Sequence, residues 1–368
     1  MSPEVTTDAE YMSRALVLAR RGLYTTDPNP RVGCVLVNDG EIVGEGWHER
    51  AGQPHAEINA LKKAGKRARG ATAYVTLEPC CHEGHTPPCT NALIKAGVSR
   101  VVAAMEDPNP LVSGKGLKAL AEAGIKVESG LLQSEAERLN PGFISRMKHR
   151  RPFVRIKLAI SLDGKTAMAS GESKWISGEA ARADVQRLRA RSSAILTGSG
   201  TVLADDPSLN VRDLQIGRQP MRVIVDANLS TPETARMFQL EGTTLVATAS
   251  DDADQADVLV KAGAEVICLP AGPDKIDMTA LMHHLAGQGV NELLVEAGAT
   301  LCGSLLEAQL VDELVVYIAP YIMGHNARGM FHLPALESMT DRVSLTIRDI
   351  RAVGDDWRIT STPNFNAV

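Results

Sequence analysis

The sequence feature that most restricts the possible folds is a repeated alternation of short apolar runs with amphipathic segments. After a hairpin pattern at 32–46, apolar runs at 73–77 and 98–105 alternate with helical patterns at 90–96 and 117–123. Runs of this length are typical of buried strands, and strands that alternate with helices form a sheet covered on both faces. The pattern predicts a three-layer α/β domain.

The same alternation returns after residue 152. We predict further strands at 154–160, 194–198, 221–225, 244–248, 265–269, 292–295 and 314–319. A chain of 368 residues exceeds the size of a single hydrophobic core, so we expect two α/β domains, at 1–148 and 149–368. Between them, Pro141-Gly142 and a basic run up to Pro152 change the composition. We interpret this run as a solvated linker rather than as a nucleic-acid contact.

Local signals delimit elements of the first domain. Thr7 and Glu10 form a capping-box pattern, which predicts the start of a helix. Asn38-Asp39-Gly40 predicts a hairpin turn. Pro54 and Pro87-Pro88 each suit the first turn of a helix. They would place His55 and Cys89 at two helix starts, where the positive end of the helix dipole favours a thiolate over a thiol.

Three possible metal ligands, His55, Cys80 and Cys89, occur in order, and Glu57 follows the histidine. One imidazole and two thiolates leave the fourth tetrahedral position of zinc open to water, whereas structural sites fill all four. Zinc lowers the pKa of its water to about 7, which gives hydroxide at neutral pH. Glu57 is placed to carry a proton from that water to departing ammonia. The pattern predicts a zinc-dependent hydrolytic deaminase with Glu57 as the catalytic residue.

A structural zinc site completed by Cys81 or His82 is the main alternative. Adjacent residues on an extended segment point to opposite sides, so Cys80 and Cys81 rarely share one ion. We therefore predict that neither Cys81 nor His82 is a ligand. Metal removal separates the two readings, because a structural scaffold would unfold whereas a deaminase would chiefly lose turnover.

Composition excludes several classes of protein. The net charge is −5 and aromatic residues make up 4% of the chain, which lacks the basic surface and stacking platforms of nucleic-acid binders. No run approaches the roughly 20 apolar residues that span a membrane. The segment Met1–Asp8 has no apolar core, which argues against a signal peptide. Clustered cysteines in such a chain indicate metal binding rather than disulfides. We expect a cytoplasmic enzyme with a small-molecule substrate.

Further residues of the first domain narrow the assignment. Pro28-Asn29-Pro30, Gly46-Trp47-His48, Leu77-Glu78-Pro79-Cys80 and Thr86-Pro87-Pro88-Cys89 resemble the deaminase domain of the bifunctional riboflavin-biosynthesis deaminase/reductase family, within the cytidine/deoxycytidylate deaminase superfamily. The resemblance implies that Asn29 and His48 hold the substrate and that His82 contacts its ring. Turn formation and a surface position are the alternatives for Asn29 and His48. His85 stands where the family pattern has Lys or Arg, a cation that could meet the substrate phosphate or ring.

The second domain carries weaker evidence of its own. Residues 294–301 run from a strand through small residues into a helix, and backbone amides at such a helix start can bind phosphate. A tight strand–helix connection explains the same residues. By itself this segment indicates only an α/β domain that could bind a nucleotide.

A second resemblance is more specific. Residues 157–165, 173–177 and 200–212 are similar to the reductase domain of the same family, whose fold resembles dihydrofolate reductase. The resemblance covers nearly the whole chain and implies NADPH as the cofactor. The residues implied to line the cofactor are Ala159, Trp175, Thr201, Asp205, Gly298, Ala299, Thr300, Leu301, Cys302, Gly303 and Ser304. Those implied for the substrate are Ser173, Arg189, Leu209, Arg212 and Glu296.

Open alternatives concern individual residues of this domain. Arg189 and Arg212 suit the sugar phosphate because a guanidinium donates two parallel hydrogen bonds, but Arg189 could instead lie on a solvated helix face. Trp175 could belong to the core. Lys157 and Asp205 are both candidates for the proton donor.

Together these features predict a bifunctional riboflavin-biosynthesis enzyme that binds Zn²⁺ and NADPH. It would deaminate 2,5-diamino-6-(5-phosphoribosylamino)pyrimidin-4(3H)-one and then reduce the ribosyl group of 5-amino-6-(5-phosphoribosylamino)uracil to ribityl. We expect a homo-oligomer that binds neither nucleic acid nor membrane. The remaining enzymatic alternative is a deaminase of tRNA or free nucleosides, in which the second half has another role.

Overall fold

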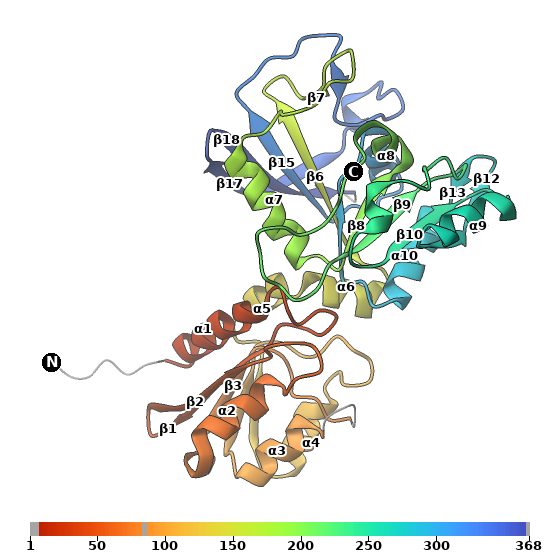
Figure 1. The fold of residues 1–368 in the computed structure, drawn as a ribbon. Helices are drawn as coiled ribbons and strands as arrows, with labels where there is room; N and C mark the ends of the chain where they lie inside the picture. The colour runs from red at the N-terminus through yellow and green to blue at the C-terminus, as the bar shows by residue number, and fades with distance from the viewer. Residues whose placement is uncertain (1–6, 83–86, 366–368) are drawn as a thin grey trace. The chain divides into compact units, whose positions relative to one another are not determined.

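The computed structural model describes residues 7–82 and 87–365 (Figure 1). Contacts within the chain divide it into two compact units, Met1–Arg150 and Arg151–Val368. Among the helices in the described ranges, none has the length and apolar character needed to cross a bilayer.

The first unit is built on a mixed sheet, which in the described residues has five strands in the order β2-β1-β3-β4-β5. The strands are β1 (Gly33–Asn38), β2 (Glu41–Trp47), β3 (Thr72–Val75), β4 (Arg100–Ala103) and β5 (Lys126–Ser129). β1 pairs antiparallel with both β2 and β3, whereas β3, β4 and β5 are parallel. The parallel strands are connected through helices, as parallel pairing requires.

Helices cover both faces of this sheet. They are α1 (Asp8–Ala19), α2 (Ala56–Ala64), α3 (Cys89–Ala96), α4 (Lys115–Glu122), α5 (Gln133–Leu139) and α6 (Pro141–His149), with short 3-10 turns at Arg20–Gly22 and Gly65–Ala68. One core joins α1, α5 and α6 to the sheet through residues such as Leu16, Val35 and Phe143. The other joins α2, α3 and α4 through Ala60, Leu36 and Leu93. The predicted three-layer domain is confirmed.

The local signals also hold. Thr7 and Glu10 form both hydrogen bonds of a capping box at the start of α1. Asp39 and Gly40 have positive φ values in the β1–β2 turn, which is the backbone that a two-residue hairpin turn requires. Cys89 is the first residue of α3, which ends at Gly97 in the left-handed conformation.

The interpretation of 141–152 as a linker is wrong for most of its length. Residues Pro141–His149 form α6, and Phe143 and Ser145 are buried. Pro141 occupies the first turn, where its missing N–H costs no hydrogen bond, and basic residues in the last turn complement the helix dipole. The basic run therefore belongs largely to a helix end rather than to a linker, although Lys148 and Arg150 are exposed as expected.

The second unit contains a larger sheet, whose order in the described part of the chain is β11-β10-β9-β8-β14-β6-β15-β18-β17. Its strands are β6 (Phe153–Ser161), β8 (Ala194–Gly198), β9 (Met221–Val225), β10 (Thr244–Thr248), β11 (Ala264–Cys268), β14 (Glu292–Val295), β15 (Glu313–Ala319), β17 (Ser344–Val353) and β18 (Asp356–Asn364). All neighbours from β11 to β15 are parallel, and β18 is antiparallel to both β15 and β17. Two small ribbons pair β7 (Lys165–Ala167) with β16 (Arg328–Gly329) and β12 (Pro270–Gly272) with β13 (Lys275–Ile276).

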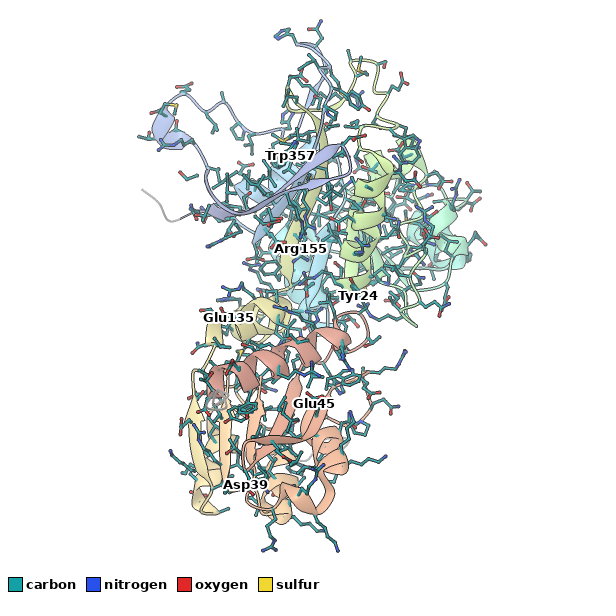
Figure 2. The ribbon with its side chains drawn as sticks, turned by 90° about the vertical axis from the view of Figure 1, so that its left-hand side faces the viewer. Tyr24, Asp39, Glu45, Glu135, Arg155 and Trp357 are labelled. Carbon is teal, nitrogen blue, oxygen red and sulfur yellow. The ribbon has the colours of Figure 1, made fainter. Side chains whose placement is uncertain are left out.

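Helices again cover two faces. They are α7 (Glu179–Arg191), α8 (Ser199–Asp205), α9 (Ala253–Lys261), α10 (Met278–Gly287) and α11 (Ala299–Glu307), with 3-10 turns at Arg236–Gln239 and Met339–Asp341. One core packs α7, α8 and α9 against the sheet, and the other packs α10 and α11. Arg155 on β6 is fully buried within the sheet (Figure 2), where it pairs with Glu292 and Glu313. This α/β unit confirms the fold class expected for the second domain.

Candidate active sites

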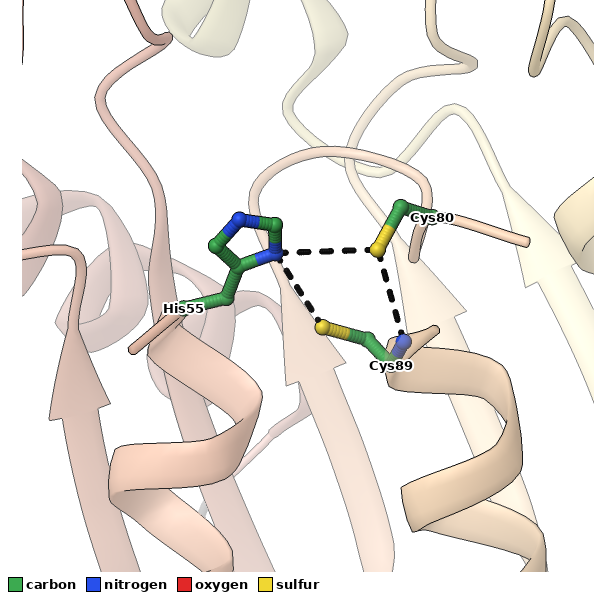
Figure 3. A group of neighbouring side chains, drawn as sticks. All are labelled: His55, Cys80 and Cys89. Carbon is green, nitrogen blue, oxygen red and sulfur yellow. Dashed lines mark hydrogen bonds between the residues drawn. The ribbon is translucent and has the colours of Figure 1, made fainter. Parts of the chain in front are cut away.

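The first site lies where the starts of α2 and α3 face the segment after β3. His55 is the N-cap of α2, Cys89 opens α3, and Cys80 lies on the connecting segment (Figure 3). His55 Nδ1 lies 3.6 Å from Cys80 Sγ and 3.3 Å from Cys89 Sγ. Within the described residues, these three donor atoms lie within 4.8 Å of one another, as a shared metal ion requires.

Close packing of α2 against β2 sets the position of His55. A Cβ atom at Gly46 would lie 2.3 Å from the carbonyl oxygen of Ala56, so only glycine allows the helix to approach this closely. The backbone of His55 is extended, and its side chain does not cap the helix. The imidazole is therefore free to face the two sulfurs.

The two thiols are arranged for a cation. The Cys89 backbone N–H donates to Cys80 Sγ at 3.4 Å. Hydrogen bonds from the Cys89 thiol and from His55 lower the pKa of the Cys80 thiol to about 4. The same thiol–thiol bond, with burial, raises the pKa of Cys89 well above its ordinary range. Two thiolates this close oppose each other's ionisation, and a bound cation removes this conflict. The donor set fits zinc.

Glu57 lies in the first turn of α2, and its side chain is 3% exposed. Burial, reinforced by the nearby Cys80 sulfur, raises the pKa of this carboxyl to about 7. Both Cys80 and Cys89 affect the pKa of this carboxyl, so Glu57 lies close to the sulfur pair. A carboxyl in this position can both accept and release a proton near neutral pH.

Asn29 and His48 form one hydrogen-bonded pair next to the metal-binding cluster. Asn29 Nδ2 lies 3.1 Å from His48 Nε2, and His48 Nδ1 lies 3.2 Å from the carbonyl oxygen of Pro54. The rings of His48 and His55 meet edge to face, with centroids 5.4 Å apart. His48 is 2% exposed, so it is not a surface residue. The His48 imidazole therefore lies beside His55, and the Asn29 amide bonds to that imidazole.

The remaining residues of this site are less closely associated. His82 is exposed and does not join the three-donor cluster. Cys81 is half-buried and, among the described residues, is also outside that cluster. The substitution noted at His85 lies outside the described residues.

The second site lies at the carboxyl ends of three central parallel strands, β8, β14 and β6. Ala159 is near the end of β6, Thr201 lies in α8 directly after β8, and Glu296 follows β14. The Glu296 backbone N–H donates to Leu196 O at 2.9 Å, and Thr197 Oγ1 donates to Glu296 O at 2.8 Å. Ligands of open α/β sheets bind at this edge.

A buried ion pair organises this edge. Arg189 Nε and Nη2 donate to the two oxygens of Glu296, and Nη1 donates to Asn210 O at 3.1 Å. Both charged side chains are 12% exposed, so Arg189 does not lie on a solvated helix face. Burial opposes ionisation of Glu296, but the charges of Arg189, Lys157 and Arg212 lower its pKa below the ordinary value. Burial lowers the pKa of Lys157.

Most of the residues expected around the cofactor lie in one segment, Gly298–Ser304, at the start of α11. Gly298 is the N-cap of α11 and offers no side-chain cap, so the helix start at Ala299 and Thr300 presents backbone amides. Cys302 and Gly303 are buried, and the Ser304 hydroxyl donates to Thr300 O at 3.0 Å. Gly298, Thr300 and Ser304 are exposed, and the uncapped first turn is the part of this segment that suits a phosphate.

Trp175 is not a core residue, because its side chain is 71% exposed. The Arg182 guanidinium lies 4.8 Å from its ring centroid. Next to it, Lys174 Nζ pairs with Asp205 Oδ1 at 3.0 Å. Of the expected substrate residues, Leu209 is buried, Ser173 is half-buried and Arg212 is exposed.

Glu78 is the residue of the first site whose role the sequence analysis missed. Its carboxylate accepts four backbone hydrogen bonds from residues 107–117. The sequence Leu77-Glu78-Pro79-Cys80 does indicate that Glu78 is surrounded by hydrogen-bond donors, because a buried acid close to a metal ligand is unfavourable without them.

Fold and donor set together define the class, a zinc-binding deaminase domain joined in one chain to an α/β reductase domain. Residues 5–105 match the family described as "Cytidine and deoxycytidylate deaminase zinc-binding region", and residues 152–359 match the "RibD C-terminal domain". The chain belongs to the RibD family of riboflavin-biosynthesis proteins.

Full-length relatives and solved structures agree. The chain is 52% identical over 361 residues to "Riboflavin biosynthesis protein RibD" of Escherichia coli (strain K12), covering 95% of this chain and 97% of that protein. The relative of the same name from Haemophilus influenzae is 51% identical over 369 residues, with 97% of both covered. The structure is similar to Acinetobacter baumannii RibD, form 1, with a TM-score of 0.90 and 46% identity over 97% of this chain and 99% of that chain.

A further solved structure carries a more explicit title. It is a diaminohydroxyphosphoribosylaminopyrimidine deaminase/5-amino-6-(5-phosphoribosylamino)uracil reductase from Thermotoga maritima. Its TM-score is 0.87 at 34% identity, covering 97% of this chain and 99% of that chain.

Proposed function

We propose that the chain catalyses two consecutive reactions on one phosphoribosylaminopyrimidine. The first unit deaminates 2,5-diamino-6-(5-phosphoribosylamino)pyrimidin-4(3H)-one by hydrolysis. The second reduces the ribosyl group of the product, 5-amino-6-(5-phosphoribosylamino)uracil, to ribityl. The observation that carries the proposal is the cluster of His55, Cys80 and Cys89 beside buried Glu57. The Thermotoga maritima relative is named for both activities.

In the first unit, His55, Cys80 and Cys89 would hold zinc. When bound, zinc lowers the pKa of a water molecule so that it can attack the ring near neutral pH. Glu57 would take a proton from the attacking water and deliver it to the departing amino group, so that one water is consumed and one ammonia leaves. Burial of this carboxyl raises its pKa, which favours uptake of the proton from water.

The substrate ring would be oriented by Asn29 and His48, which are already paired to each other. His82 is proposed as a more peripheral contact, since its side chain is exposed. Because Asn29 and His48 are fixed before substrate binds, little conformational entropy is lost on binding.

In the second unit, NADPH would lie along the carboxyl edge of the sheet and supply the hydride. The residues proposed to line it are Ala159, Trp175, Thr201, Asp205 and the segment Gly298–Ser304. The exposed Trp175 ring and the uncapped first turn of α11 support this placement. Lys157 and Asp205 remain the candidates for the proton donor.

The sugar phosphate is proposed to bind chiefly to Arg212. Of the five N–H groups of a guanidinium, Arg189 uses three on Glu296 and Asn210, which leaves two. Arg212 is exposed and adds its charge to the same edge. Ser173, Leu209 and Glu296 would complete the substrate pocket.

We place the deaminase in residues 1–148 and the reductase in residues 149–368, and we propose a cytoplasmic enzyme. The six cysteines of the chain are all free thiols, which a reducing compartment maintains.

We propose that the enzyme is a homo-oligomer that associates through one face of the β17–β18 hairpin. Residues paired across antiparallel strands lie on the same face. The register brings six apolar residues to this face, which we call the hairpin face: Leu345, Ile347, Ile350, Ala352, Trp357 and Ile359. Leu345, Ile347, Ile350 and Trp357 are each about half exposed (Trp357, Figure 2).

On the opposite side of the hairpin, the β18 residues Arg358 and Thr360 are buried, whereas Arg348, Asp349 and Arg351 of β17 are exposed. There, Arg358 and Tyr317 both bond to Asp184 of α7, at 2.8 and 2.7 Å. The hairpin face itself has no charged side chain among its paired positions, so it fits an equally apolar surface. A second copy of the chain has the same apolar surface, and a two-fold axis would bury the hairpin faces of both copies against each other.

An optical assay on the purified full chain tests the proposed function. Ammonia should be released from the diaminopyrimidine without NADPH, and NADPH should be oxidised only after that step. Oxidation of NADPH in the absence of ammonia release would contradict the proposed order.

A further inference from the structure

Glu78 is a buried acid placed between the metal-binding cluster and α4. It is 3% exposed, follows β3 and precedes Cys80 by two residues. Its carboxylate accepts four backbone N–H groups, from Asp107 (3.0 Å) and Gly114 (2.9 Å) to Oε2 and from Gly116 (2.8 Å) and Leu117 (3.2 Å) to Oε1.

These donors are those of an uncapped helix start. The N-cap of α4 is Gly114, which has no side chain to accept a hydrogen bond. Gly116 and Leu117 are the second and third residues of the helix, whose N–H groups an N-cap side chain ordinarily satisfies. Glu78 therefore caps α4 from a separate segment of the chain, and its negative charge lies at the positive end of the helix dipole.

The helix start packs directly against the residue before Cys80. A Cβ atom at Gly116 would lie 2.1 Å from Pro79 O, so glycine is required for this contact. On the other side, the Thr90 N–H of α3 donates to Cys80 O at 3.2 Å. The backbone of 79–80 is thus held between the first turns of α3 and α4.

The same carboxylate fastens both ends of the connection between β4 and α4. Asp107 and Gly114 lie at either end of it and share Oε2. Within the connection, Asp107 Oδ1 accepts the Asn109 N–H at 2.8 Å. One side chain therefore ties the Cys80 segment, the connection and α4 into a single unit.

We propose that Glu78 is a positioning residue for the metal ligand Cys80. The inference rests on the proposed role of Cys80 as a zinc ligand. Glu78 acts through the backbone of residues 79–80. It needs both carboxylate oxygens, because each of them accepts two N–H groups. In Glu78→Gln, an NH₂ group would face two of these donors, and the loss of two acceptor bonds would loosen the unit. Outer residues that orient metal ligands typically change metal affinity by about 10–100-fold.

Zinc release from the full chain to an excess of the chelator 4-(2-pyridylazo)resorcinol tests this. Glu78→Gln is expected to release zinc about 10–100-fold faster than the unsubstituted protein. Glu78→Asp keeps the charge with a shorter reach and should fall between the two. The matched control is Glu122→Gln, an exposed acid at the end of the same helix, which should release zinc at the unsubstituted rate.

Cobalt substitution supplies a second readout. The sulfur-to-cobalt absorption band should shift in Glu78→Gln and stay unchanged in Glu122→Gln, while the far-ultraviolet circular dichroism spectrum, compared with that of the unsubstituted protein, shows whether the variant is folded. An unchanged release rate and band in folded Glu78→Gln would overturn the inference. If Glu78→Gln does not fold, the same two readings on Glu78→Asp decide. Absence of a sulfur–cobalt band in the unsubstituted protein would instead refute the proposed zinc site itself.

Discussion

Arg189 and Glu296 form a two-point ion pair at the carboxyl edge of the larger sheet, with Nε–Oε1 at 2.6 Å and Nη2–Oε2 at 3.0 Å. The pair connects α7 to the residue that follows β14. Because both side chains are largely buried, Arg189 has a structural role in addition to any role in ligand binding. Arg189 and Arg212 were both expected to bind the sugar phosphate. In the structure Arg189 is paired with Glu296, whereas Arg212 is exposed.

Arg212→Ala should raise the KM of the reductase substrate by roughly tenfold or more, since a charge-assisted bond to phosphate contributes about 1.5–3 kcal/mol. Deamination should be unaffected. The control is Arg187→Ala, which removes an exposed guanidinium from α7. Steady-state kinetics of both reactions check this, and an equal loss of both activities would show that the two sites are not separable.

The cysteines offer a matched comparison. Cys89→Ser should abolish stoichiometric zinc binding and deamination, because it removes one of three clustered donors. Cys81→Ser changes the residue adjacent to Cys80 and should retain zinc. Zinc content by atomic absorption distinguishes the variants, and retention of one zinc per chain in Cys89→Ser would contradict the proposed ligand set.

Much of the fold could be predicted from the sequence, because periodicity reports burial. The apolar runs at 194–198, 221–225 and 244–248 coincide with β8, β9 and β10. The β17–β18 hairpin was not predicted. Its strands mix charged and apolar residues, since one face bonds to α7 and the other is exposed, so neither a continuous apolar run nor a simple alternation results. A bulge between Ile347 and Asp349 further breaks the period.

The sites were predictable to different depths. The spacing of His55, Cys80 and Cys89 indicated a shared metal, and the structure brings their donor atoms together. The pairing of Arg189 with Glu296 could not be predicted, because it depends on how two distant segments meet in space. For Glu78, the sequence shows an acid close to a metal ligand, but its four partners are backbone amides, which residue types cannot identify.

Acid should destabilise the second unit in part through Asp226. This carboxylate is 1% exposed and accepts Ser230 Oγ, Thr231 N and Thr231 Oγ1. Burial raises the pKa of Asp226, but these hydrogen bonds outweigh burial and lower the pKa below its ordinary value. A lowered folded-state pKa stabilises the fold above the unfolded value of about 3.9, and that stability is lost as pH falls through the folded-state pKa.

Asp226→Asn should therefore unfold at lower urea concentration than the unsubstituted protein at pH 6, with the difference shrinking toward pH 3. Circular dichroism during urea titration measures this. Asp254→Asn, at an exposed position in α9, is the control. A constant difference across this pH range would argue against the assigned role of Asp226.

The hairpin face predicts a specific effect on assembly. Trp357→Glu or Ile350→Glu should convert the oligomer to monomer, because a charge would be buried in an apolar interface. Leu203→Glu, at an exposed position on α8, should leave assembly unchanged. Sedimentation velocity measures the mass, and a monomeric unsubstituted protein, or an oligomer that survives both hairpin substitutions, would exclude this face.

The central claim is that a three-ligand zinc site works with Glu57 as its proton carrier. Zinc content and ammonia release measured on the same sample of Glu57→Gln test it most directly. We predict one zinc per chain, deamination slower by about 10²–10⁴-fold, and normal NADPH oxidation when the deaminated substrate is supplied. Ammonia release at the unsubstituted rate by the zinc-loaded variant would contradict the account.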